Sequence, residues 1–331
     1  MKPFDEYIFL APGSDYGTVM WNDLKAVPNC TYYDYVLNEQ CPPLLNSLHH
    51  LHFSFFLNKF MTLPFQHVWK KGYSVKIENF SDDKKYCVIF TDISACRVDV
   101  KYLQELQSIA NVELVLVLVN IVLSKRRLLE KRFKYFSTIF SFDKSDCDRY
   151  GFIHHASFYS KLPIDTSGKK VSDVFFVGVS KGMRHEKLAK LYNRLKKNNL
   201  VPVFYLAHHK NVRDRVDGIH YNEWLSYKDV LNKVSHTNCI LEIVGDNQEG
   251  MTLRSMEAIC YNKRLITDNL AITRLKYFES GFIQYLPQIE DADLSFLKDT
   301  TPVDYQYEND FSPIKLLEHI EEVFSMKVDK K

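Results

Sequence analysis

The chain has 331 residues, 46% of them hydrophobic, which is enough for two domains with separate cores. Its net charge of +2 gives no overall field to attract nucleic acid, and we expect no such partner. Seven cysteines, an odd number without closely spaced pairs, favour reduced thiols in a cytoplasmic protein over a disulfide framework or a zinc site.

Two segments bear on membrane insertion. The first fifteen residues carry acids and only a strand-length apolar run, unlike a signal peptide. The longest apolar run, residues 112–123, contains Glu113 and Asn120 and is too short to cross a bilayer. We therefore expect a cytoplasmic protein without a membrane-spanning helix.

The first half of the chain alternates strands and helices. Short runs rich in Val, Ile, Phe and Tyr predict strands, and apolar residues at helical spacing predict helices. The expected strands are 7–10, 73–77, 86–91, 112–119 and 138–141. The expected helices are 44–61, 100–110, 125–135 and 145–150. This alternation predicts a parallel sheet covered by helices.

A turn containing Gly13, Asp15 and Gly17 follows the first expected strand. Glycine at such a turn lets a substrate approach the backbone closely. Asp15 is a candidate general base toward a substrate hydroxyl; alternatively it is an ordinary turn residue. The chain has no GxGxxG motif here, so a nicotinamide or flavin site is poorly supported.

The expected helix 125–135 mixes cations with large apolar residues. Its cations include Arg126, Arg127, Lys131 and Arg132. Such a helix can lie on an anionic bilayer. This predicts peripheral attachment at the inner face of the plasma membrane; the alternative is a solvated helix with its leucines turned inward.

Residues 157–170, which include Pro163 and Gly168, are the best linker candidate. We therefore expect domains at 1–165 and 166–312, and a C-terminal helix and tail at 313–331 that begins with Ser312-Pro313. The second domain repeats the alternation and predicts a second parallel sheet. Its expected strands are 173–178, 201–206, 240–244 and 264–267, and its expected helices include 187–198 and 227–234.

Two cations follow strand 173–178, which stops at Gly178. Lys181 and Arg184 can neutralise a departing diphosphate through charge-assisted hydrogen bonds. Arg184 is favoured because its guanidinium can bind phosphate in a bidentate way. The alternative is a solvated loop at a helix start. We include Gly178 among the residues expected to bind the molecule that carries this diphosphate.

The segment 239–269 predicts, in this order, a buried strand, a polar loop, a helix and a second strand. Glu249 and Glu257, eight positions apart, flank the start of the expected helix. The amides of Gly250, Met251 and Thr252 would be unpaired donors at the helix N-terminus, which is an anion site. Phosphate at these amides, with carboxylates for sugar hydroxyls, is the chemistry of a nucleotide-sugar pocket.

With Gly250 after the first Glu and Ala258 after the second, the Glu249-x7-Glu257 spacing resembles the donor motif of GT-B glycosyltransferases. Residues 262–269 resemble the turn, lysine and hydrophobic strand that follow in that family. Thr252 and Arg254 make the helix most similar to bacterial transferases of capsule, exopolysaccharide and lipopolysaccharide synthesis. The alternative is an ordinary βαβ unit with surface carboxylates.

The resemblance implies an α/β protein of two Rossmann-like domains facing a cleft, with the C-terminal helix packed back on the first domain. It implies that Glu257 binds the ribose, that Glu249 reaches the donor sugar and that the segment from Tyr221 borders the base. Alternatively, Trp224 and Tyr227 fill a helix–sheet interface.

The same resemblance implies transfer of a sugar from a nucleotide-diphosphate donor, expected to be UDP-linked, to a glycan or lipid-linked acceptor. No metal and no cofactor are expected. Two rivals remain: a non-catalytic GT-B relative that assists another transferase, and a nucleotide-sugar epimerase.

Overall fold

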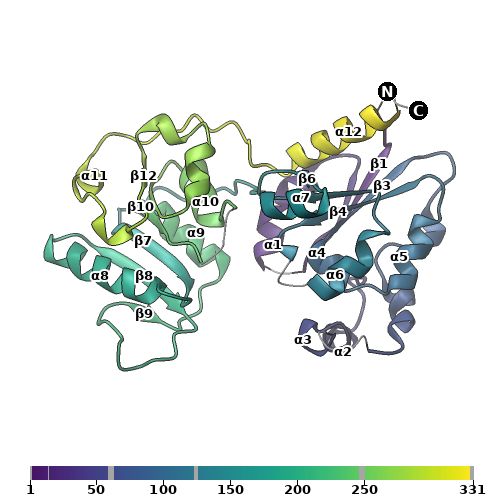
Figure 1. The fold of residues 1–331 in the computed structure, drawn as a ribbon, viewed down its shortest axis with the longest axis horizontal. Coiled ribbons are helices and arrows are strands. Elements are labelled where there is room, and N and C mark those ends of the chain that lie inside the picture. The colour runs from purple at the N-terminus through teal and green to yellow at the C-terminus, as the bar shows by residue number, and fades with distance from the viewer. Residues whose placement is uncertain (1, 14, 59–62, 123–125, 246–249, 329–331) are drawn as a thin grey trace. The chain divides into compact units, whose positions relative to one another are not determined.

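The computed structural model describes residues 2–13, 15–58, 63–122, 126–245 and 250–328 (Figure 1). The chain divides into two compact units, one formed by Met1–Ser160 with Phe311–Lys331 and the other by Lys161–Asp310. The sequence placed these boundaries at 165/166 and 312/313. Among the described residues, no helix is long and apolar enough to cross a membrane.

The first unit contains a six-stranded parallel sheet in the order β2-β1-β3-β4-β5-β6. The strands are β1 (Glu6–Leu10), β2 (Cys30–Tyr33), β3 (Tyr86–Thr91), β4 (Val112–Leu118), β5 (Thr138–Ser141) and β6 (Ile153–His154). The helices are α1 (Asp15–Met20), α2 (Pro43–His52), α3 (Phe55–Asn58), α4 (Asp92–Cys96), α5 (Val100–Gln107), α6 (Arg126–Phe133), α7 (Lys144–Tyr150) and α12 (Ile314–Val328).

Both faces of this sheet are buried, as the uninterrupted apolar strands require. In β3, Val88 and Phe90 join a core on one face, whereas Cys87 and Ile89 join a core on the other. The first core also receives side chains of α5 and α6, and the second receives side chains of α12.

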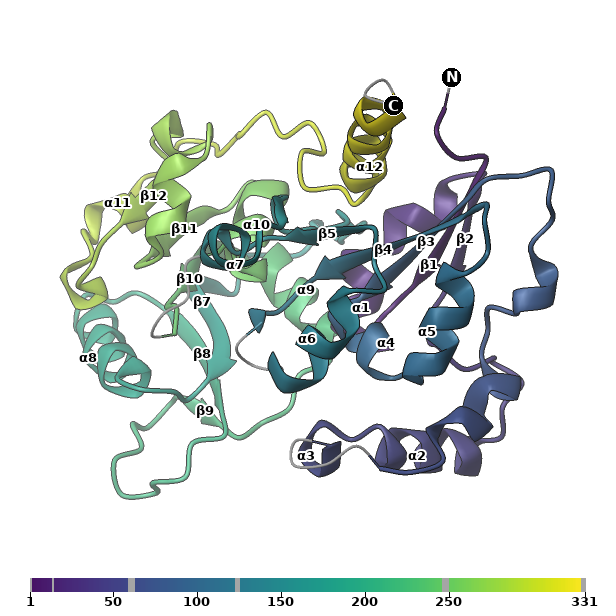
Figure 2. The same ribbon diagram turned by 45° about the vertical axis from the view of Figure 1, so that its right-hand side comes forward.

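The C-terminal helix belongs to the first unit, as predicted. Leu316 and Ile320 of α12 are fully buried in the core that contains Tyr7 and Phe9. The Tyr7 hydroxyl also donates a 2.8 Å hydrogen bond to Oε1 of Glu321. The chain therefore returns to its first sheet after the second unit is complete (Figure 2).

The second unit contains a six-stranded parallel sheet in the order β12-β11-β10-β7-β8-β9. Its strands are β7 (Ser172–Val179), β8 (Pro202–Ala207), β9 (His220–Tyr221), β10 (Thr237–Glu242), β11 (Arg264–Thr267) and β12 (Ile283–Tyr285). Its helices are α8 (Arg184–Lys197), α9 (Tyr227–Ser235), α10 (Leu253–Cys260) and α11 (Ser295–Lys298).

In each sheet the strand order reverses at one place. β1 lies between β2 and β3, and β7 lies between β8 and β10. In open α/β sheets, ligands bind outside the carboxyl ends of the strands at such a reversal. The loops after β7 and β10 are therefore the expected ligand site of the second unit.

Two expected elements of the first unit differ from the structure. Residues 73–77 form no strand: Tyr73 makes an isolated antiparallel bridge with Leu37, and a 3-10 turn, Ile77–Asn79, follows. The expected helix 44–61 is divided, because α2 ends at His52 and α3 begins at Phe55.

Candidate functional site

The loops after β7 and β10 meet beside Gly245. A Cβ built on Gly245 would lie 3.9 Å from both the Lys181 ammonium and Nη2 of Arg184. Nη1 of Arg184 donates a 2.7 Å hydrogen bond to the Val179 carbonyl, which holds the guanidinium near the end of β7. Two cations from one loop therefore stand beside the start of the loop that leads to α10.

A second charged group lies on α10. Oε1 of Glu257 accepts hydrogen bonds from Nη2 of Arg254 at 2.6 Å and from the Tyr227 hydroxyl at 2.7 Å. Glu257 is 0% exposed. Burial raises the pKa of Glu257 to about 7, against the opposing effects of the Arg254 charge and the Tyr227 hydrogen bond.

This pair is incompletely satisfied. Oε2 of Glu257 and Nη1 of Arg254 are both buried, and neither has a hydrogen-bond partner among the described residues. Buried polar atoms almost always have partners, so the unmet acceptor of Glu257 and the unmet donor of Arg254 make this pair a candidate for contact with a hydroxyl-bearing ligand. Such a ligand would donate to the carboxylate and accept from the guanidinium.

Glu242, which the sequence analysis included only in an apolar strand, organises this region. Its carboxylate accepts hydrogen bonds from the hydroxyls of Thr252, Ser255 and Thr267. These residues come from the turn before α10, from α10 and from β11, so one buried carboxylate ties three segments together. The sequence did contain a signal for this role: Glu242 is an acid within the apolar run Ile240–Val244, and a buried charge without partners would destabilise the fold.

The start of α10 is set by Thr252. The helix begins at Leu253, and Thr252 is its N-cap, whose side chain accepts from the Arg254 amide at 3.0 Å. Gly250 and Met251 precede the helix, and the Gly250 carbonyl accepts a 3.1 Å hydrogen bond from the Asn269 side chain. The sequence predicted a loop up to Gly250 with the amides of Gly250, Met251 and Thr252 at the helix N-terminus; of these three residues, Thr252 is the N-cap, and the other two precede it.

Two catalytic candidates lie where their side chains are not described. Glu249 falls outside the described residues. Asp15 is the first residue of α1, and only its backbone is described. Gly13, two residues before it, has a φ of 67° and packs so closely that a Cβ there would lie 2.4 Å from the Tyr35 ring. The roles of Glu249 and Asp15 stay predictions.

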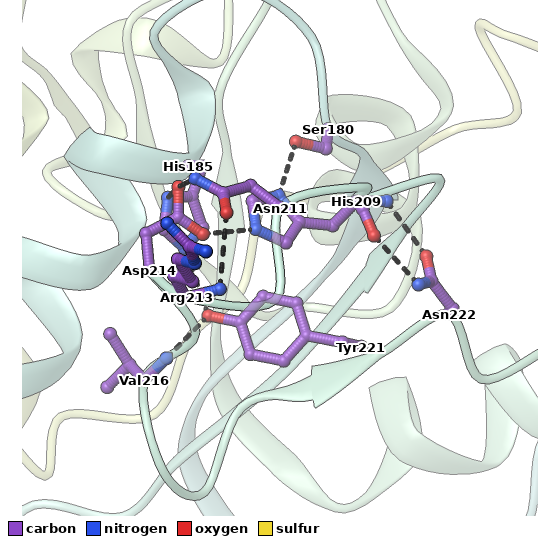
Figure 3. Close-up of polar contacts among 9 residues, drawn as sticks. All are labelled: Ser180, His185, His209, Asn211, Arg213, Asp214, Val216, Tyr221 and Asn222. Atoms are coloured by element: carbon purple, nitrogen blue, oxygen red, sulfur yellow. Dashed lines mark hydrogen bonds and ion pairs between the residues drawn. The ribbon is translucent and has the colours of Figure 1, made fainter.

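A hydrogen-bonded cluster joins the loops after β7 and β8 (Figure 3). Nε2 of His209 contacts Oδ1 of Asp214 at 2.6 Å, and its Nδ1 contacts the Ser180 hydroxyl at 3.0 Å. Nε2 of His185, in α8, contacts the Tyr221 hydroxyl at 3.0 Å. Tyr221, a donor-binding candidate, therefore uses its hydroxyl within the protein, where it also accepts from the Val216 amide.

Ligand atoms of His185, His209 and Asp214 lie within 4.8 Å of one another, a spacing that a metal ion can use. The two imidazole rings, however, are stacked with centroids 4.2 Å apart and 26° between their planes. Nitrogen lone pairs lie in the ring plane, so stacked rings direct them side by side and not toward one ion. The geometry favours hydrogen bonding, in which His209 lowers the pKa of Asp214.

Gly178, Trp224 and Tyr227 differ in how far they are buried. Gly178 lies within β7, where a Cβ would approach the Phe176 ring to 2.8 Å, so packing by itself accounts for this glycine. Trp224 is 77% exposed, whereas Tyr227 is buried. The suggestion that both fill a helix–sheet interface therefore fails for Trp224.

The basic helix does not present its apolar face to a membrane. Leu128 and Leu129 are buried in the core of the first unit. Arg132 is also buried, and its guanidinium donates to the carbonyls of Ala95, Leu128 and Val98. The expectation of a membrane-binding α6 was wrong, because its apolar side covers the sheet.

No protein-family model matches the sequence, and a search of curated proteins found no match. Solved structures do match. An α-glucosyltransferase solved with UDP and a 13-mer DNA containing a HMU base has a TM-score of 0.55 at 12% identity, over 96% of this chain and 98% of that chain. A UDP-GlcNAc 2-epimerase from Methanocaldococcus jannaschii, solved with UDP-GlcNAc and UDP, has a TM-score of 0.51 at 11% identity, over 95% and 98%. At such identities the likeness concerns the fold, and the predicted fold class is confirmed: this chain has two Rossmann-like units of the GT-B type.

Proposed function

We propose that the protein is a glycosyltransferase that takes a sugar from a UDP-linked donor and transfers it to a glycan or lipid-linked acceptor. The observation that carries this proposal is the meeting of Lys181 and Arg184 beside Gly245, at the strand-order reversal of the second sheet. Two cations there suit a diphosphate, and helix α8 begins in the same loop, which adds a positive dipole end.

In the proposed reaction, the bond from the sugar C1 to the phosphate oxygen breaks, and a bond from C1 to the acceptor oxygen forms. The electron pair leaves with UDP, whose developing charge Lys181 and Arg184 stabilise. The proton of the acceptor hydroxyl passes to a base, for which Asp15 is the candidate. Glu249 is the candidate for contact with the donor sugar.

The Arg254–Glu257 pair supports a nucleotide as the leaving part. A ribose has two neighbouring hydroxyls, which can donate to Oε2 of Glu257 and accept from Nη1 of Arg254, the two buried atoms that lack partners among the described residues. Gly250, Met251, Thr252 and Tyr221 complete the proposed donor contacts.

The resemblance of residues 239–269 to capsule and lipopolysaccharide transferases supports surface polysaccharide synthesis as the setting, with the enzyme in the cytoplasm. We propose catalysis without a metal ion, since two side-chain cations supply the charge that a metal would otherwise provide. Equal turnover with and without EDTA checks this point, and a loss restored by Mn²⁺ or Mg²⁺ contradicts it.

Thermal shift with a panel of UDP-, GDP- and dTDP-sugars tests donor binding, because a ligand that binds only the folded state raises Tm. We expect UDP-sugars to stabilise the wild type. Lys181→Ala together with Arg184→Ala should abolish the shift, whereas Lys197→Ala, at the exposed far end of α8, should keep it. No shift with any nucleotide sugar would refute the proposal.

Product analysis separates the rivals. A transferase releases UDP at a rate that rises with acceptor, whereas an epimerase converts the donor without acceptor. The epimerase stays a candidate because a UDP-GlcNAc 2-epimerase shares the fold. Donor binding without either reaction would favour a non-catalytic partner of another transferase.

A further inference from the structure

Ser180 directly follows β7 and begins the loop that carries Lys181 and Arg184. Its amide donates a 2.8 Å hydrogen bond to the carbonyl of Ala207, the last residue of β8. Its hydroxyl contacts Nδ1 of His209 at 3.0 Å. The backbone and the side chain of Ser180 therefore both tie the loop after β7 to the end of β8 and the loop that follows it.

His209 is itself held by hydrogen bonds of its backbone and its ring. Its amide donates to Oδ1 of Asn222 at 2.8 Å, and its carbonyl accepts from Nδ2 of Asn222 at 2.8 Å. Its Nε2 contacts Oδ1 of Asp214 at 2.6 Å, and Oδ2 of Asp214 accepts a 3.0 Å hydrogen bond from Asn211. Asp214, His209 and Ser180 thus form a continuous chain of hydrogen bonds (Figure 3).

The direction of these hydrogen bonds depends on the charge of His209. The hydrogen bond from His209 lowers the pKa of Asp214, so Asp214 is a carboxylate that only accepts, and Nε2 of His209 carries a hydrogen in both charge states. In the neutral ring, Nδ1 has no hydrogen and accepts from the Ser180 hydroxyl. In the protonated ring, Nδ1–H donates to the Ser180 oxygen, and the hydrogen of the serine becomes available to another acceptor.

His185 of α8 and Tyr221 of β9 also face the His209 ring. The His185 ring is stacked on it with centroids 4.2 Å apart, and Nδ1 of His185 lies 3.8 Å from Oδ2 of Asp214. Burial, followed by the nearness of His209, lowers the pKa of His185, which favours a neutral His185. The Tyr221 centroid lies 5.0 Å from that of His209, and Arg215 lies 5.2 Å from the Tyr221 centroid. Of the two histidines, only His209 has the carboxylate at hydrogen-bond distance.

A diphosphate bound by Lys181 and Arg184 changes the charge balance around this chain. Without a ligand, the two cations in the Ser180 loop disfavour a further positive charge beside them. The phosphate charges offset the cations, and the phosphate oxygens accept hydrogen bonds. A bound diphosphate therefore favours the state in which His209 is charged and Ser180 can donate.

We infer that His209 and Asp214 are positioning residues of the loop 180–184, and that a bound donor diphosphate draws a proton from the solvent to Nδ1 of His209. The Ser180 hydroxyl is then free to donate to a phosphate oxygen, while neither His209 nor Asp214 has to touch the ligand. The inference rests on the proposed function, because it takes the diphosphate to lie at Lys181 and Arg184.

Isothermal titration calorimetry with UDP tests the inference. At about pH 7, within the range where histidines change charge, titrations in two buffers of different ionisation enthalpy report the protons taken up on binding. The wild type should take up more protons than His209→Asn, a comparison in which the ionisation of UDP itself cancels. The ratio of wild-type affinity to His209→Asn affinity should fall as pH rises, by at most about tenfold per pH unit for one linked proton.

Two further variants separate positioning from charge. His209→Ala should weaken UDP binding roughly tenfold, because the Ser180 hydroxyl loses its partner. His209→Asn should restore part of that loss, since its amide can reach the Ser180 hydroxyl without carrying charge. The matched control His208→Asn makes the same change at the exposed neighbour, whose φ of 57° asparagine tolerates, and should keep the wild-type proton uptake.

Three results would overturn the inference. One is UDP binding by the wild type with the same proton uptake as His209→Asn. Another is loss of the uptake in His208→Asn as well. The third is UDP binding by His209→Ala as tight as that of the wild type. Wild-type protein that does not bind UDP at all would instead contradict the proposed function, so the two failures are distinguishable.

Discussion

Helices α2 and α6 of the first unit look alike as sequences and are placed in opposite ways. Each combines large apolar residues with basic ones. α6 buries Leu128 and Leu129, whereas α2 exposes Leu44 and Leu48. Amphipathic spacing therefore identifies two faces of a helix but not which face meets the protein.

The difference lies in what the polar residues contact. In α6, Arg132 reaches inward to the carbonyls of Ala95 and Val98, and the leucines enter the core around it. In α2, the inward contacts belong to His49, which packs against Trp69 and Phe53. Three pairs of variants test this contrast, beginning with the pair expected to have the largest effect.

Arg132→Ala should destabilise the protein by roughly 4 kcal/mol, because it leaves three buried carbonyls without their charged donor. Lys131→Ala, at the exposed neighbour, should change stability by less than about 0.5 kcal/mol. Urea unfolding followed by circular dichroism measures both. Equal stability of the two variants would mean that Arg132 is solvated and that α6 is not anchored as described.

Leu129→Ala should cost about 3 kcal/mol, the usual loss for a fully buried leucine. Leu48→Ala should leave the free energy of unfolding nearly unchanged, because the side chain is already exposed in the folded protein. The same urea experiment compares them. A large loss for Leu48→Ala would show that the outer face of α2 is covered in solution.

His49 should make the protein sensitive to acid. Burial, assisted by the nearby His50, lowers the pKa of His49 to about 3. The unfolded chain takes up the proton near pH 6.5, so stability is full above that pH and is lost as pH falls toward 3. The slope is about 1.4 kcal/mol per pH unit. His49→Gln should flatten the curve between pH 7 and 5, whereas the exposed control His67→Gln should keep it.

Glu257 should make stability depend on pH in the opposite direction and more weakly. The charge of Arg254 offsets part of the rise in the Glu257 pKa that burial causes. Its pKa is raised to about 7 in the folded protein from 4.5, so its contribution is full below pH 4.5 and is lost as pH rises toward 7. Glu257→Gln should remove this decline in Tm, while Glu186→Gln, an exposed carboxyl on α8, should not. An unchanged profile in Glu257→Gln would mean that the carboxylate is already ionised throughout that range.

The candidate site was partly predictable from sequence. Lys181 and Arg184 follow a strand, and a parallel sheet brings such loops to one edge, where the structure places them beside Gly245. The helix was expected after the loop that ends at Gly250, but Thr252 was not identified as its N-cap. Glu242 was missed because its three hydroxyl partners are distant in sequence.

The sequence by itself determined the alternation of strands and helices, and therefore two parallel sheets. The predicted bounds of three buried strands, Tyr86–Thr91, Thr138–Ser141 and Arg264–Thr267, agree with the structure to the residue, because burial leaves a local apolar pattern within each of them. The edge strand β2 left no such pattern. Only the tertiary structure decided which face of α2 and of α6 is exposed, since that choice depends on hydrogen bonds and packing with residues far along the chain.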